Sequence, residues 1–148
     1  MVYNFFCFIS FIVWFITFWY MMNSMRSFAF ERLEVYKKCR SLVADVYRLQ
    51  RIFPIEERYG LGNQVRRAAI SITANLAEGS GRQSVKEKIH FLEISFGSLM
   101  EVFSELQTAA DLAYITEAQL NELRPQITEI AKMLSGLRKK LNNQLSTP

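Results

Sequence analysis

The tetrapeptide Glu87-Lys88-Ile89-His90 is a Glu-x-x-His motif, whose residue types can bind a metal ion. Di-iron helical bundles use two such motifs plus two further inward-facing glutamates. His90 is the only histidine of the chain, and it lies beside the apolar position Ile89 and not on the apolar stripe. Only a symmetric oligomer could supply the missing half, so we expect no metal ligands and a partly exposed His90.

A second candidate is Gly79-Ser80-Gly81, which could suggest a phosphate-binding loop. Such loops follow a strand, open a helix and have G-x-x-x-x-G-K-[ST] or G-x-G-x-x-G spacing. Here Gly79 comes at the end of a helical pattern, and no Lys-Ser or Lys-Thr follows. The single histidine also has no identifiable nucleophile partner. We therefore predict a protein that is not an enzyme, with no catalytic residues and no cofactor.

Arginines and lysines offer a third chemistry, the binding of phosphates with release of counterions. We expect one cluster at adjacent helix ends and a second basic strip near the start of the first helix. The alternative is an ordinary solvated helix face, or ion pairs with Glu56, Glu57 and Glu78. The first cluster would contain Arg58, Arg66, Arg67, Arg82, Lys86 and Lys88, and the strip Lys37, Lys38 and Arg40. The candidate nucleic-acid-binding residues are Arg66, Arg67, Arg82, Lys86, Lys37, Lys38 and Arg40.

Charge divides the chain into two parts. The first 24 residues carry none, whereas all 18 Lys and Arg and all 14 Asp and Glu lie in residues 25–148. The net charge of +4 permits a polyanionic partner without requiring one. The two cysteines, Cys7 and Cys39, form neither a disulfide framework nor a cysteine zinc site. A reducing cytoplasm fits this cysteine usage.

The uncharged leader allows two interpretations. Residues 2–22 are long enough to span a bilayer, which takes about 20 apolar residues, and lack the features of a signal peptide. As an anchor, their basic flank would hold the rest of the chain in the cytoplasm. Alternatively, this Phe- and Ile-rich stretch is translated non-coding DNA, and Met25 is the true start. We assign residues 1–24 to the apolar leader and 25–148 to one domain.

Helical periodicity appears in four segments after Met25, and strand-like alternation in none. The first covers about residues 28–52 and ends before Pro54, which disfavours helix at the preceding residue. The second covers about residues 61–77, with Gly79 and Gly81 where left-handed caps are expected.

The third and fourth segments open with capping boxes, Ser84 with Glu87 and Thr116 with Gln119. Pro125 lies inside the fourth segment and predicts a bend near Asn121, not an end. Both segments carry heptad seams. The seams are Ile89, Leu92, Phe96, Leu99, Phe103, Leu106, Ala110, and Leu120, Leu123, Ile127, Ile130, Leu134, Leu137, Leu141.

Short connections between these segments predict an all-α, up-down-up-down antiparallel four-helix bundle with an apolar N-terminal extension. Small residues in the second segment predict that it packs unusually close to a neighbour, and Gly97-Ser98 in the third predicts the same. The small residues are Ala68, Ala69, Ser71, Ala74 and Ala77.

Four quoted stretches carry a family resemblance: "FPIEERYGLGNQVRRAAISITANLAEGSGR", "FLEISFGSLMEV", "DLAYIT" and "MLSGL". They resemble the four-helix-bundle family of 23S rRNA-intervening sequence proteins, which includes accessory variability proteins of diversity-generating retroelements. The resemblance covers about residues 28–141. The family pattern R-R-A-x-x-S-I-P-x-N-I-A-E-G is matched except at Thr73 and Leu76, where proline and isoleucine are usual. Thr73 should leave this helix straighter than in relatives.

The resemblance implies a homo-oligomeric barrel, typically a pentamer, without enzymatic activity. For the retroelement branch it also implies binding of nucleic acid and of a reverse transcriptase. We therefore expect a non-catalytic, cytoplasmic oligomer that binds structured RNA or DNA, or a nucleoprotein partner, through its basic patches. The alternative is a structural oligomer without a nucleic-acid role, tethered to a membrane if the leader is real.

Overall fold

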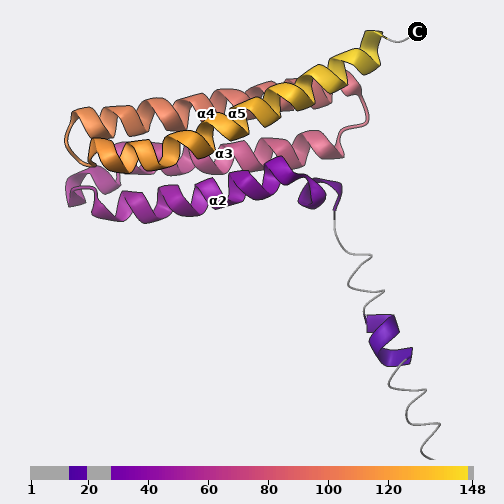
Figure 1. Ribbon diagram of the computed structural model, residues 1–148, viewed down its shortest axis with the longest axis horizontal. Helices are drawn as coiled ribbons and strands as arrows, with labels where there is room; N and C mark the ends of the chain where they lie inside the picture. Colours follow the sequence, from indigo (N-terminus) through magenta and orange to yellow (C-terminus); the bar gives the residue numbers. More distant parts are fainter. Residues whose placement is uncertain (1–13, 20–27, 147–148) are drawn as a thin grey trace, which may run out of the picture.

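The computed structural model describes residues 14–19 and 28–146, and its four long helices lie side by side as rods (Figure 1). These helices are α2 (Glu34–Leu49), α3 (Leu61–Gly81), α4 (Val85–Asp111) and α5 (Glu117–Ser146). Successive helices run in opposite directions, so the predicted all-α, up-down-up-down bundle is confirmed. Most of the leader, residues 1–24, lies outside the described residues. Within the described ranges, no helix has the length and apolar character needed to cross a membrane.

The first predicted helix is divided into three pieces. The 3-10 turn η1 (Ala29–Arg32) precedes α2, and the 3-10 turn η2 (Gln50–Ile52) follows it. Leu33, between η1 and α2, is extended, so the continuous helix expected over residues 28–52 is wrong. Phe53 is extended before Pro54, as the steric conflict with a proline requires, and a third 3-10 turn, η3 (Ile55–Arg58), leads into α3.

The end of α3 also differs from its prediction. The helix continues through Gly79 to Gly81, and no glycine in the described residues has a positive φ, so the predicted left-handed caps are wrong. A Cβ on Gly79 would lie 2.9 Å from the Cβ of Phe91 on α4. Gly79 lies inside α3, and the close approach of α4 explains why this position is a glycine. No turn is needed to explain it.

Small residues bring α3 and α4 together, and this is the most extensive helix contact of the bundle. The Oγ atoms of Ser71 and Ser98 lie 2.8 Å apart, and the Oγ of Ser95 donates to the Ile72 carbonyl at 2.8 Å. Of the small residues predicted to pack closely, Ala68 and Ala69 are buried and Ser71 contacts α4, whereas Ala74 is exposed. Gly97 is different: a Cβ there would meet nothing within 4 Å, so it makes no close packing inside this chain.

The buried face of α4 is rotated from the predicted seam. Leu92, Leu99 and Leu106 are buried as expected, whereas Phe96 and Phe103 are only partly buried. The other buried positions of α4 are Ser95, Ser98, Val102 and Ala109. The predicted Ser84 capping box does not form, because the Ser84 side chain makes no cap bond and the Glu87 carboxylate faces Arg82 at 3.9 Å.

The turn from α4 into α5 is closed by backbone bonds. Ala113 adopts φ 56°, and the Tyr114 N–H donates to the Ala109 carbonyl at 2.8 Å, the pattern of a Schellman cap. The Thr116 capping box is confirmed: the Gln119 N–H donates to Thr116 Oγ1 at 3.2 Å, and Gln119 Oε1 accepts from the Thr116 N–H at 2.9 Å. As predicted, α5 does not end at Pro125.

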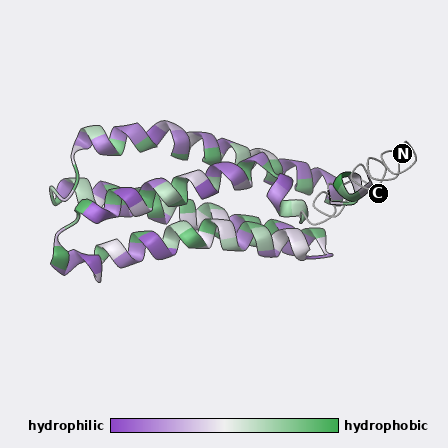
Figure 2. Ribbon diagram, turned by 90° about the horizontal axis from the view of Figure 1, so that it is seen from below, coloured by the Kyte–Doolittle hydropathy of each residue, from purple (hydrophilic) through white to green (hydrophobic). Residues whose placement is uncertain are grey.

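Every helix of the bundle contributes to one apolar core. Hydrophobic and hydrophilic residues interleave along each rod, as expected for amphipathic helices (Figure 2). The largest fully buried side chains include Leu42 of α2, Ile72 of α3, Leu99 of α4 and Ile130 of α5. The four helices therefore pack around one apolar core, and their charged side chains lie on the outer faces and at the ends of the bundle.

Candidate nucleic-acid interface

The basic residues predicted as one cluster lie at opposite ends of α3. Arg66 and Arg67 are near its start, and Arg82 follows its last residue. Sixteen residues separate Arg66 from Arg82, which corresponds to about 24 Å along a helix that rises about 1.5 Å per residue. The expected single cluster of Arg58, Arg66, Arg67, Arg82, Lys86 and Lys88 is therefore wrong.

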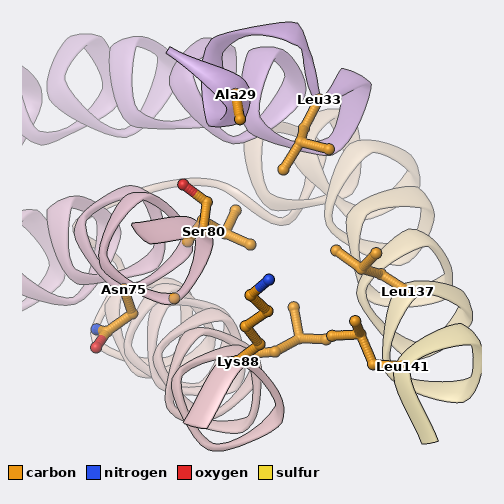
Figure 3. A pocket seen from close by; sticks show the side chains of 10 residues that line it. Ala29, Leu33, Asn75, Ser80, Lys88, Leu137 and Leu141 are labelled. Carbon is orange, nitrogen blue, oxygen red and sulfur yellow. The ribbon is translucent and has the colours of Figure 1, made fainter. Parts of the chain in front are cut away.

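Arg82 and Lys86 instead share an end of the bundle with the basic strip of α2. An apolar pocket of about 200 Å³ lies at this end (Figure 3). Its lining comes from η1, from Leu33 and from residues of α3, α4 and α5. Leu33 precedes α2, Ser80 closes α3, Lys88 opens α4, and Leu137 belongs to the last turns of α5. We call this half of the molecule, residues 29–41, 72–97 and 129–146, the basic end.

Charge is distributed unevenly along the bundle. The basic end carries eleven lysines and arginines against six acids, whereas the opposite half, residues 42–71 and 98–128, carries six against eight. Uneven charge of this kind creates a positive potential on one surface, which attracts anions more than the net charge indicates. The excess comes from residues 29–41, with four bases against two acids, and residues 129–146, with four against one, whereas residues 72–97 have three of each.

Some of these cations already have acidic neighbours. Lys37 Nζ lies 2.6 Å from Glu34 Oε1, and Lys38 Nζ lies 2.9 Å from Glu129 Oε2. Arg82 pairs with Glu78 and lies over the Phe91 ring, 4.8 Å from its centroid. Exposed pairs like these contribute little to stability and exchange readily with other anions.

Other basic candidates are free. Arg40 and Lys86 are exposed, and neither forms an ion pair or hydrogen bond within the described residues. Arg67, near the start of α3, is also exposed and forms no ion pair or side-chain hydrogen bond within the described residues. These side chains could contact phosphates without first breaking a bond to the protein.

Arg66 has a structural role. Its guanidinium donates to Gln50 Oε1, to the Arg58 carbonyl at 3.0 Å and to Asn63 Oδ1 at 3.5 Å. Gln50 is buried with 7% of its surface exposed, so Arg66 satisfies a polar group that would otherwise be buried without a partner. Arg66 thus fixes the loop between α2 and α3.

Arg66 also completes a pocket that the sequence analysis missed. Its lining is Gln50, Arg51, Arg58, Tyr59 and Arg66, and its volume is about 430 Å³. We call it the arginine pocket. Arg51 lies in η2 and Arg58 in η3, so a break in the helix brings them to Arg66. The available signal was the aromatic and basic pair Arg58-Tyr59 in the loop.

The apolar pocket at the basic end has a different character. Leu33, Leu137 and Leu141 form much of its wall, and the Lys88 side chain extends its amine toward the middle of the opening (Figure 3). Asn75 lies at the rim, where its amide donates to the Ser71 carbonyl at 2.8 Å. This bond keeps the Asn75 amide within α3.

The groups considered for catalysis are not assembled into a site. His90 is exposed and Glu87 faces Arg82, and no group of three metal-binding side chains occurs in the described part of the chain. Burial raises the pKa of the Cys39 thiol to about 12. Since the thiolate is the reactive form, this buried cysteine is unsuited to nucleophilic chemistry.

Known proteins resemble this chain in sequence and in fold. The family model of the 23S rRNA-intervening sequence protein matches residues 31–136. A crystal structure of a protein of unknown function from the S23 ribosomal protein family of Bacteroides thetaiotaomicron matches with a TM-score of 0.66 and 25% sequence identity. The match covers 71% of this chain and 98% of that one. No curated protein matches the chain.

The family model covers α2, α3, α4 and most of α5, and it includes every residue of the arginine pocket. Ala29, Leu137 and Leu141 of the apolar pocket lie outside the matched residues. The structural match extends over nearly the whole of the Bacteroides protein, so the two chains share one four-helix fold. The chain belongs to the family of 23S rRNA-intervening sequence proteins.

Proposed function

We propose that the protein is a non-catalytic, cytoplasmic homo-oligomer that binds structured nucleic acid or a nucleoprotein partner through its basic end. One observation carries this proposal: eleven basic against six acidic residues lie in the half of the molecule where α2 begins, α3 meets α4 and α5 ends. Among the basic candidates on that half, Arg40 and Lys86 are exposed and unpaired within the described residues, whereas Lys37, Lys38 and Arg82 each pair with an acid. Phosphate neutralisation by such groups supplies most sequence-independent affinity for nucleic acid.

The test is a filter-binding titration with labelled RNA and DNA hairpins at low salt. Removing two unpaired candidate contacts, as Arg40→Gln with Lys86→Gln, should weaken binding at least about tenfold, because each phosphate contact contributes to affinity. The matched control is Arg48→Gln with Arg124→Gln, which removes the same charge from the opposite half. Equal losses in the two double variants would show that the basic end is not the binding surface.

The homo-oligomer, a pentamer in the family that the sequence resembles, is supported by exposed apolar side chains on α3 and α4. Ile70 is 45% exposed, and Ile94 and Met100 are each 38% exposed. Association of copies through α3 and α4 would remove these side chains from water. Light scattering during gel filtration should give about five times the chain mass of 17.3 kDa. A monomeric mass across the accessible concentration range would contradict this part of the proposal.

A further inference from the structure

The arginine pocket gathers three cations from three different elements. Arg51 comes from η2, Arg58 from η3 and Arg66 from α3. Arg66 is held in place by Gln50 and by the Arg58 carbonyl, so one guanidinium of the three is fixed before any ligand arrives. Arginine presents a planar fork of donors that matches two phosphate oxygens, which makes a fixed guanidinium an effective phosphate ligand.

The protein itself does not neutralise this charge. Within the described residues, neither Arg51 nor Arg58 forms an ion pair or a side-chain hydrogen bond. Glu57, which precedes Arg58, is partly buried and forms hydrogen bonds with other groups. Its Oε2 accepts from the Leu61 N–H at 3.1 Å, and its Oε1 accepts from the Tyr114 hydroxyl at 3.4 Å. Glu56 is exposed and pairs with none of the arginines. An anion in the pocket would relieve the repulsion among them.

The surrounding half of the molecule carries two more acids than bases, yet this does not exclude an anion. Exposed charges beyond about 8 Å are largely screened at physiological ionic strength, so the three close arginines dominate the field inside the pocket.

Tyr59 adds an aromatic surface beside these cations. It lines the pocket and is 88% exposed, so its ring contributes almost nothing to the core of this chain. An exposed aromatic ring beside a basic groove is the arrangement on which unpaired bases stack. A paired base inside a duplex cannot present its face to such a ring.

Building on the proposed function, we propose that the arginine pocket binds one unpaired nucleotide of single-stranded nucleic acid. Arg51 and Arg58 contact the phosphate, Arg66 holds the loop and offers its remaining donor edge, and the base stacks on Tyr59. The volume of about 430 Å³ lies in the range of small-molecule sites, roughly 300–1,000 Å³. This site is at the opposite end of the bundle from the basic end, so the two surfaces would contact different parts of one nucleic acid.

The experiment is a fluorescence anisotropy titration of the full chain with a labelled oligouridylate, an oligothymidylate and a hairpin duplex of equal phosphate number. Tyr59→Ala should weaken binding of both single strands at least about fivefold and leave duplex binding unchanged, and Tyr59→Phe should retain the ring and the affinity. Arg51→Gln and Arg58→Gln should each weaken single-strand binding and reduce the salt slope by about one. The matched controls Ile55→Ala and Arg48→Gln change exposed residues outside the pocket and should leave single-strand affinity unchanged.

The outcomes separate the two proposals. If the wild-type protein binds the hairpin but Tyr59→Ala, Arg51→Gln and Arg58→Gln leave single-strand affinity unchanged, the pocket proposal is overturned while the function of the basic end is retained. If the wild-type protein binds none of the three probes at low salt, both proposals fail. Equal losses of single-strand and duplex affinity in Tyr59→Ala would also overturn the stacking role. Loss of RNA binding alone, with oligothymidylate unaffected, would restrict the occupant to ribonucleotides.

Discussion

Glu105 on α4 carries an unusual carboxyl group. Its Oε2 is the only buried side-chain oxygen that lacks a hydrogen-bond partner in the described part of the chain. Burial, with a smaller effect from Glu101, raises the pKa of Glu105 from 4.5 to about 7. The folded state therefore binds this proton more tightly than the unfolded state does. The contribution of this protonated group to the free energy of unfolding is fully present below about pH 4.5 and is lost as the pH rises through about 7.

The first prediction follows from that sign. At pH 8, Glu105→Gln should raise the free energy of unfolding by about 1 kcal/mol, a small value because solvent partly screens this group. Near pH 4 the substitution should change stability little. Urea unfolding at both pH values measures the difference. Glu122→Gln, at an exposed position of α5, is the control and should show no such pH dependence. Equal effects of Glu105→Gln at the two pH values would show that the carboxyl titrates normally.

The adjacent arginines of α3 give a second prediction. Arg66→Ala should lower the free energy of unfolding by about 1–3 kcal/mol, because buried Gln50 loses a charged partner. Arg67→Ala should change it by less than about 0.5 kcal/mol, since Arg67 is exposed. Chemical denaturation of the two variants checks the contrast. Similar stabilities would mean that the bond between Arg66 and Gln50 does not hold the loop.

At this scale the sequence predicted the exposure of the basic candidates better than their grouping. Arg40, Lys86 and Arg67 are exposed and free, as a phosphate-binding role requires. The grouping of Arg66 with Arg82 was wrong because sixteen residues, most of them in α3, place the two about 24 Å apart at opposite ends of that helix. The arginine pocket was missed because it depends on the break after Leu49, where a continuous helix was expected.

At the level of elements, the helix patterns predicted α5 most accurately. Its seam residues Leu120, Ile127, Ile130 and Leu134 are buried, and its capping box forms. The buried face of α4 was predicted less well because Ser95 and Ser98 occupy it. Serine counts as polar in a periodicity pattern, yet here each hydroxyl bonds to α3, so burial is possible without loss of a hydrogen bond.

The turn after α4 gives a third prediction. Ala113 has φ 56°, a left-handed conformation that costs an L-residue roughly 1 kcal/mol and costs glycine almost nothing. Ala113→Gly should therefore raise stability by up to about 1 kcal/mol in thermal unfolding. Ala74→Gly, at an exposed position inside α3, should instead destabilise the fold by about 1 kcal/mol. Destabilisation by Ala113→Gly would contradict the strained cap.

At the scale of the whole molecule, a rigid apolar core separates two polar regions of different character. The basic end combines cations from α2, the α3–α4 turn and α5, and the arginine pocket combines three arginines with an exposed tyrosine. No group of three metal-binding side chains occurs in the described residues. This arrangement suits a protein that binds an extended anion at more than one point.

The central claim is that phosphates bind at the basic end, and the dependence of nucleic-acid affinity on salt tests it most directly. Each phosphate neutralised contributes about −0.9 to the slope of log affinity against log salt for a duplex. We expect a clearly negative slope for the wild-type protein, reduced by about two in the Arg40→Gln, Lys86→Gln variant and unchanged in the Arg48→Gln, Arg124→Gln control. A flat salt dependence, or the same slope in all three proteins, would contradict the claim.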